Sequence, residues 1–192
     1  MAVASFGDVD ITLAASHMPE LDEPVHVSEY DASWPEMFAA ERARLIEALG
    51  ANSENLQHIG GTAVPGLVAK PIIDLMLGLT AYPPSQAMRH AIGGLGYEAL
   101  GEAGVPGRLY FRLRALQLSA NLHVVAQGGT HWVQNIALRD YLRANPAARE
   151  RYARAKLAAV ASGAQALLAY SSAKAAVVNA LLQEACAHQN GS

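Results

Sequence analysis

The sequence predicts a single α+β domain, in which helices flank a small mixed sheet and further helices form the C-terminal part. Three observations favour this class. The chain has 192 residues, of which 52% are hydrophobic and 16% charged, so it is long enough to bury a core in one domain. Before residue 127, short segments alternate between the helical and the strand pattern. After residue 127, long segments rich in Ala and Leu indicate helices only.

The first elements of the chain are expected to be a short strand and a helix. Residues 25–30 alternate between apolar and polar side chains, which predicts a strand. A helix is expected over residues 35–49, since Asp31 or Ser33 can cap its start and a proline occupies its first turn. Gly50 follows the last apolar residue and is expected to end this helix.

A pair of strands with a loop between them follows the first helix. The strands are expected over residues 56–59 and 71–79, and the loop, residues 60–66, consists mostly of small residues. The second strand is apolar on both faces, as in a sheet covered on each side, and Asp74 is its one charged residue. The remaining elements are a helix, two strands and three helices, expected in that order over residues 85–95, 109–113, 118–126, 132–142, 146–161 and 164–187.

Composition argues against several classes of function. Lys and Arg number 14 and Asp and Glu number 17, which gives a net charge of −3, whereas non-specific nucleic-acid binders are usually basic. No apolar stretch reaches the roughly 18 residues of a membrane span, and the start of the chain lacks the parts of a signal peptide. The single cysteine, Cys186, excludes an internal disulfide. We therefore expect a cytoplasmic protein.

The chain is expected to divide into a flexible extension, one domain and a short tail. Residues 1–24 contain no Lys or Arg and are expected to form the extension. The domain is expected over residues 25–187, and the tail over residues 188–192. The Ser-His-Met triplet at residues 16–18 and the final Gly-Ser resemble cloning remnants, so part of the extension is expected to be foreign to the natural protein.

The loop after residues 56–59 is the first candidate binding site. Gly60 and Gly61 let a ligand approach the main chain, and their N–H groups can bind an anion. Thr62 adds a hydroxyl group. An ordinary turn is the alternative interpretation. The loop is not a Walker motif, because Lys70 lies too far along the chain.

Three polar residues on strands form the second candidate. A buried carboxylate is costly unless it is paired or metal-bound, so Asp74 is expected to face a cleft, an arginine or a cation. Asn121 and His123 are two residues apart and therefore share one face of their strand. If the two strands are neighbours, His123 can orient Asp74, bind a metal or act as an acid or base. A structural salt bridge for Asp74 and a core histidine for His123 are the alternatives.

Basic side chains in several segments suggest a site for phosphate groups. Arg108 and Arg112 flank a tyrosine on one face of a strand, and Arg139 lies one helical turn before a second arginine in the segment LRDYLR. The chain has only three lysines, at positions 70, 156 and 174. Paired arginines near a glycine turn would form an anion site, and solvated surface charge is the alternative.

Several of these segments together resemble a known family. The similarity covers most of residues 25–185 and is to the GrpB family, also called UPF0157. It implies a nucleotidyltransferase fold of the polymerase-beta-like superfamily, and members of the family also occur fused to dephospho-coenzyme A kinase. The segments that carry the resemblance are VHVSEYDASWPEMF (25–38), HIGGTAVPGLVAKPIIDL (58–75), LHVV (122–125), LRDYLRANP (138–146) and YARAK (152–156).

The resemblance also implies a mechanism, from which this sequence departs. In the superfamily a Gly-Ser turn holds phosphates, two carboxylates spaced D-x-D hold a divalent metal, and a later strand supplies a third carboxylate. Here Gly61 replaces the serine, Met76 replaces the second carboxylate, and Asn121 and His123 occupy the strand of the third. Methionine is a poor ligand for Mg²⁺, which prefers oxygen. One cation held by Asp74 and a metal-free anion pocket are the two remaining possibilities.

The residues and the resemblance lead to two alternative functions. The first is a nucleotidyltransferase-like enzyme that uses a nucleotide or phosphorylated cosubstrate on a small molecule, with Asp74 and His123 catalytic and Mg²⁺ on Asp74. The second is a non-catalytic module that binds a nucleotide or a coenzyme-A-like ligand beside an eroded metal site. Either would be a monomer or homodimer whose partner is a small molecule, not a specific nucleic acid or a membrane. The expected ligand-binding residues are Gly60, Gly61, Thr62, Lys70, Arg108, Arg112, Asn121, Arg139, Tyr141 and Lys156.

Overall fold

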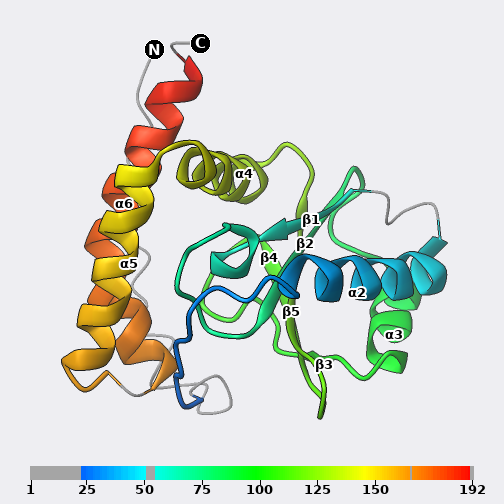
Figure 1. The fold of residues 1–192 in the computed structure, drawn as a ribbon. Coiled ribbons are helices and arrows are strands. Elements are labelled where there is room, and N and C mark those ends of the chain that lie inside the picture. The colour runs from blue at the N-terminus through cyan, green and yellow to red at the C-terminus, as the bar shows by residue number, and fades with distance from the viewer. Residues whose placement is uncertain (1–22, 51–54, 165, 191–192) are drawn as a thin grey trace.

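A mixed five-stranded sheet lies at the centre of the computed structural model, which describes residues 23–50, 55–164 and 166–190 (Figure 1). The strands follow the order β1-β2-β5-β4-β3 across the sheet. β2 and β5 are parallel, and the other neighbouring pairs are antiparallel. The strands are β1 (Leu56–Ile59), β2 (Ile73–Leu79), β3 (Glu98–Ala99), β4 (Arg108–Arg114) and β5 (Ser119–Ala126). The expected α+β class with a mixed sheet is confirmed.

Helices flank the sheet in two groups (Figure 1). α2 and α3 lie together on one side, and α5 and α6 stand side by side on the other, with α4 next to them. Their bounds are α2 (Trp34–Leu49), α3 (Gln86–Gly94), α4 (Thr130–Ala144), α5 (Pro146–Ala161) and α6 (Leu167–Asn190), and a 3-10 turn, η3, covers Gly61–Ala63. Within the described ranges, no helix combines the length and the apolar character that a membrane crossing requires.

The two faces of the sheet differ in polarity. Alternate residues of β2 and β5, such as Leu75 and Leu122, are fully buried against α2 and α3 and form the main core. The opposite face carries Asp74 and His123 towards one end. At its other end Trp132 of α4 packs on Gly78, where a Cβ would lie 2.5 Å from the indole ring. The apolar face thus stabilises the sheet, and the polar end of the other face is available for a site.

Most of the expected elements are confirmed, and the differences lie in short or terminal segments. Residues 25–30 do not form a strand, because among the described residues their main chain forms a single β-bridge, between Ser28 and Ala69. β3 is not predicted by the sequence, since two residues show no periodicity. α6 begins at Leu167 and continues through Asn190, so residues 188–190 of the expected tail are helical.

The expected N-terminal extension lies almost wholly outside the described residues, as do the Ser-His-Met triplet and the final Gly-Ser. The two described residues of this segment already contact the domain. Glu23 forms an ion pair with Arg114 at 2.6 Å, and Pro24 forms a β-bridge with Ala166 before α6.

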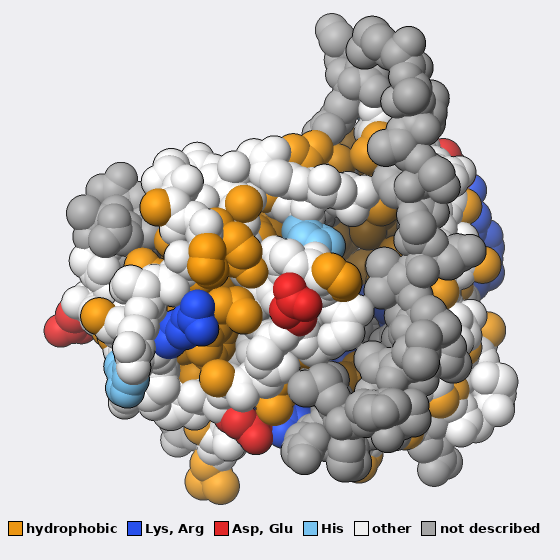
Figure 2. All heavy atoms as spheres, turned by 180° about the vertical axis from the view of Figure 1, so that it is seen from behind, with side chains coloured by type: hydrophobic (Ala, Val, Ile, Leu, Met, Phe, Trp, Pro, Cys, Tyr) orange, Lys and Arg blue, Asp and Glu red, His pale blue; other side chains and the backbone are white. Residues whose placement is uncertain are grey.

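The exposed basic side chains are dispersed on the face shown in Figure 2. In the described part of this face, Lys and Arg occupy separate places and do not form one continuous patch. A much denser grouping of basic side chains lies inside the fold, in the cavity described next.

Candidate functional site

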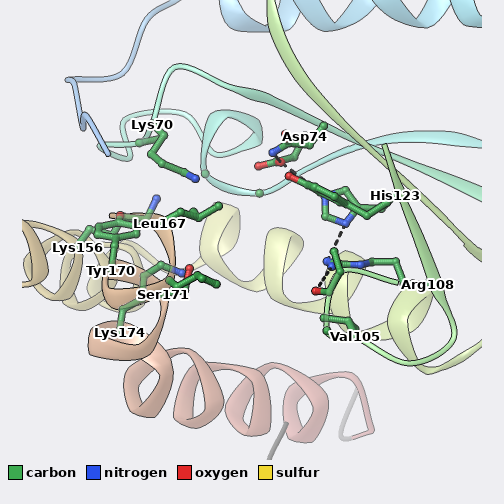
Figure 3. A pocket seen from close by; sticks show the side chains of 18 of the residues that line it. Lys70, Asp74, Val105, Arg108, His123, Lys156, Leu167, Tyr170, Ser171 and Lys174 are labelled. Atoms are coloured by element: carbon green, nitrogen blue, oxygen red, sulfur yellow. Dashed lines mark hydrogen bonds and ion pairs between the residues drawn. The ribbon is translucent and has the colours of Figure 1, made fainter. Parts of the chain in front are cut away.

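A cavity of about 360 Å³ lies between the polar end of the sheet face and the helices α5 and α6. Its sheet wall comes from β2, β4 and β5, and its helical wall from α5 and the first two turns of α6. The Gly60–Gly61 turn and residues 103–105 complete the lining. In Figure 3 the three lysines project from one side, and Asp74, His123 and Arg108 face them from the other.

Both glycines of the turn are required for close contacts with charged side chains. Gly60 has a φ of +72°, a conformation that favours glycine. A Cβ on Gly60 would collide with Oδ2 of Asp74. A Cβ on Gly61 would lie 2.5 Å from Nζ of Lys156 and 2.8 Å from Cβ of Ala69. The absence of two side chains therefore lets a carboxylate and an ammonium group approach the same turn.

Asp74 is held by its neighbour on the parallel strand. The register places Asn121 beside Asp74, and the Asn121 amide nitrogen donates to Oδ1 of Asp74 at 2.7 Å. Arg114 donates to the amide oxygen of Asn121 at 3.1 Å, which orients this amide. Burial alone would raise the pKa of Asp74, but His123, Lys70 and Asn121 outweigh it and hold that pKa below its ordinary value. Asp74 is therefore ionised at neutral pH.

His123 lies between Asp74 and Arg108. Arg108 donates from NH1 to Nδ1 of His123 at 3.4 Å, so the imidazole proton resides on Nε2. Nε2 faces Oδ1 of Asp74 at 3.6 Å, which is too long for a hydrogen bond. Burial lowers the pKa of His123 below its ordinary value; Asp74 opposes this and the charge of Arg108 adds to it, so the ring is neutral at neutral pH.

Two buried donors at this end of the cavity have no hydrogen-bond partner among the described residues. They are Nε2 of His123 and Nε of Arg108. Buried polar atoms are normally satisfied, and an exception often marks a place for a ligand or an ordered water. An oxygen atom of a ligand in the cavity would satisfy either donor.

All three lysines of the chain line this one cavity, together with Arg108. Lys156 is only 4% exposed and donates from Nζ to the carbonyl of Val68 at 2.9 Å. Burial, and next the charge of Lys174, lowers the pKa of Lys156 to about 7. Burial also lowers the pKa of Lys70 and that of Lys174. These amines are poorly solvated and carry charges of the same sign, so an anion among them would be strongly favoured.

The structure brings most of the predicted residues to the cavity but not all of them. Arg112 pairs with Glu98 at 2.8 Å across β3 and β4. Arg139 pairs with Asp140 and donates to the carbonyl of His58. Four of the expected ligand residues are placed outside the cavity lining, namely Thr62, Arg112, Arg139 and Tyr141.

The polar groups of Thr62 and Tyr141 are used within the fold. The hydroxyl of Thr62 contacts Nε2 of His58 and donates to the carbonyl of Ile72. The hydroxyl of Tyr141 donates to Glu184 at 3.1 Å and so links α4 to α6.

Lys174 is a basic residue of the cavity lining that is not among the expected ligand residues. A signal was present in the sequence, because a tyrosine precedes both helical lysines by four residues, which places each pair on one helix face. Nζ of Lys156 lies 4.6 Å from the centre of the Tyr152 ring, and Nζ of Lys174 lies 5.4 Å from the Tyr170 ring. Both rings line the cavity as well.

The donor set around Asp74 does not fit Mg²⁺. Among the described residues, no group of three or more His, Cys, Asp or Glu side chains is placed to hold a metal ion. Asp74 is the one carboxylate among the described residues of the cavity lining, and its Oδ1 faces the N–H groups of Asn121 and His123. Met76 is fully buried against Ile59 and Val125. In proteins Mg²⁺ is usually held by one or two carboxylates together with water and substrate phosphates. Here the single carboxylate of the described lining is surrounded by cations and N–H donors, which oppose a divalent cation.

Comparisons with known proteins agree on one family. The family model described as GrpB protein matches residues 24–184. The UPF0157 protein BH1888 of Halalkalibacterium halodurans is 32% identical over 158 residues, which are 82% of this chain and 80% of that protein. The UPF0157 protein YqkA of Bacillus subtilis is also 32% identical, over 129 residues; the match spans 67% of this chain but 38% of YqkA.

Solved structures give a similar result. The crystal structure of the conserved protein GrpB from Enterococcus faecalis has a TM-score of 0.75 and 31% identity, and the match covers 83% of this chain and 96% of that one. A weaker likeness is to the Cid1 poly(U) polymerase, with a TM-score of 0.45 and 13% identity over 77% of this chain and 48% of that chain.

Proposed function

We propose that the cavity of this chain, which belongs to the GrpB family, binds a small molecule that carries phosphate groups. A nucleotide is the expected class of ligand. One observation carries the proposal. Lys70, Lys156, Lys174 and Arg108 come from separate segments of the chain and converge on one cavity. Ammonium and guanidinium groups are the usual partners of phosphate in proteins.

The remaining lining supports a ligand with a flat, partly apolar part. Tyr110, Tyr152 and Tyr170 line the cavity together with Leu167 and Leu168. Aromatic and apolar side chains of this kind can cover a base or a similar ring. The cavity volume of about 360 Å³ falls within the range of small-molecule sites, roughly 300–1,000 Å³.

Calorimetric titration with ADP, ATP, AMP and adenosine tests the proposal. We expect the phosphorylated compounds to bind and adenosine to bind at least about 10-fold more weakly, since the basic side chains recognise the phosphates. Lys174→Met should weaken nucleotide binding by a similar factor. Arg154→Met on α5 is the matched control, because Arg154 is 67% exposed and pairs with Glu150 away from the cavity lining. Equal binding of adenosine and the nucleotides would refute the proposal.

A phosphoryl- or nucleotidyl-transfer enzyme is the second candidate, favoured by the placement of Asp74 and His123 beside the lysines. Ionised Asp74 would accept the proton of an acceptor hydroxyl while that oxygen attacks phosphorus. The surrounding lysines would stabilise the charge of the leaving phosphate. Asp74→Asn separates the two functions: it should tighten anion binding about 10-fold, because it removes the one carboxylate, and should abolish turnover. Turnover at the full rate in this variant would exclude the catalytic role.

A further inference from the structure

We propose that the ligand carries about three negative charges, as a diphosphate does near neutral pH, and that it binds without a divalent metal. This inference rests on the proposed function, because it assumes that the cavity holds a phosphate-bearing molecule. Beyond the proposed function, the inference specifies how many negative charges the ligand carries and that no divalent cation accompanies it.

The net charge of the cavity lining indicates how many negative charges the ligand carries. An anion bound among the lysines favours their protonated form, which burial alone disfavours. With all of them protonated, Lys70, Lys156, Lys174 and Arg108 face one carboxylate, Asp74, and leave a net charge of +3 among the described lining residues. His123 adds none, since Arg108 donates to its Nδ1 and holds the ring neutral. Buried charge is costly unless it is matched by charge of the opposite sign. A monophosphate carries about two negative charges and each further phosphate adds about one, so a diphosphate matches the lining.

The arrangement of the donors supports two phosphate groups rather than one. In Figure 3 the lysines lie on one side of the cavity, and Arg108 and His123 lie on the other. The lysine side provides ammonium groups, and the opposite side provides the two buried N–H groups that have no partner among the described residues. One phosphate at each side would use both sets of donors, and a single phosphate would leave one set unsatisfied.

The same arrangement opposes a metal-bound triphosphate. A divalent cation would enter a region of positive potential, which costs Coulomb energy. One oxygen of the single carboxylate in the described lining is already engaged, because Asn121 donates to Oδ1 of Asp74 at 2.7 Å. Lys70 adds a further positive charge near Asp74 and contributes to its lowered pKa.

Titration with inorganic phosphates tests the inference without a contribution from a base. The probes are orthophosphate, pyrophosphate and tripolyphosphate, each titrated into the full chain by calorimetry, once with EDTA and once with excess Mg²⁺. We expect pyrophosphate in EDTA to bind most tightly, at least about 10-fold more tightly than orthophosphate, and Mg²⁺ to weaken its binding. Tripolyphosphate that binds most tightly, and only with Mg²⁺, would overturn the inference and leave the proposed function intact.

A charge variant makes the test specific. Lys174→Met lowers the net charge of the lining by one, so the preference for pyrophosphate over orthophosphate should shrink to about threefold or less. Arg154→Met, on the exposed face of α5, should keep the full preference. A Lys174→Met protein that is folded by circular dichroism and retains the full preference would contradict the inference. If none of the three anions and no nucleotide binds, the proposed function itself fails.

Discussion

Two groups of basic side chains, one on α4 and one in the cavity lining, differ in how far nearby acids offset their charge. The α4 pair, Arg139 and Arg143, is engaged by the fold: Arg139 donates to the carbonyl of His58 at 3.1 Å, and Arg143 donates to the carbonyl of Ala63 at 2.8 Å. The cavity cluster, which comprises Lys70, Lys156, Lys174 and Arg108, shares a single carboxylate among the described lining residues.

The difference shows how similar residues near one turn have different functions. Guanidinium groups that donate to main-chain carbonyls hold the segments on either side of the turn in place. Ammonium groups that converge without matching acids raise the local potential and attract an anion. Donation to a main-chain carbonyl does not by itself separate the two groups, because Lys156 and Arg108 also make such bonds. What differs is the acid available: Arg139 and Arg143 pair with the half-exposed Asp140, whereas the four cations of the cavity share Asp74.

The largest expected effect is a loss of affinity for ADP when a cation of the cavity cluster is removed. Lys156→Met removes a cation that is 4% exposed and lies beside the turn, so we expect the affinity for ADP to fall about 100-fold. The midpoint of thermal unfolding should change by less than about 4 °C, because methionine fills similar space and removes a buried charge, which offsets the lost hydrogen bond to the carbonyl of Val68. Calorimetric titration and a thermal melt measure the two quantities, with Arg154→Met as the control. An unchanged affinity would place Lys156 with the structural group.

The comparison also shows what sequence reasoning can and cannot predict. The helix at residues 35–49 and the strand at residues 56–59 are confirmed, because local periodicity and end signals determine such elements. Asp74 beside the diglycine turn also follows from local sequence, since both belong to one strand–loop–strand segment. The partners of basic residues do not follow from local sequence. Arg139 and Lys174 both lie on helices, and the packing of α4 and α6 decides which of them reaches the cavity.

An intermediate effect is expected when the α4 pair is disrupted. Arg143→Met leaves the buried carbonyl of Ala63 without its donor. The free energy of unfolding should fall by about 1 kcal/mol, as for loss of one hydrogen bond to a charged group that is partly exposed. Affinity for ADP should stay within about twofold of the unchanged protein. Urea denaturation measures the first quantity and calorimetry the second; a loss of affinity without a loss of stability would reverse the assignment of this arginine.

The smallest expected effect is a pH dependence at His58, which links the α4 pair to the core. His58 is stacked on Phe38 and contacts Thr62 through Nε2. Burial is the largest cause of a pKa lowered from 6.5 to about 4; Asp74 opposes it, and the charges of Arg143 and Arg139 add to it. The unfolded chain therefore binds more protons than the folded one between these values, so this histidine costs stability as pH falls from 6.5 towards 4.

His58→Gln isolates this contribution. Between pH 7 and pH 6 the unchanged protein should lose about 0.7 kcal/mol more of its unfolding free energy than the variant does. Urea denaturation at both values measures the difference, and other titrating groups, Lys156 included, cancel because both proteins contain them. Identical losses in the two proteins would mean that His58 has the same pKa in the folded and the unfolded chain, so that neither burial nor the arginines of α4 lower it.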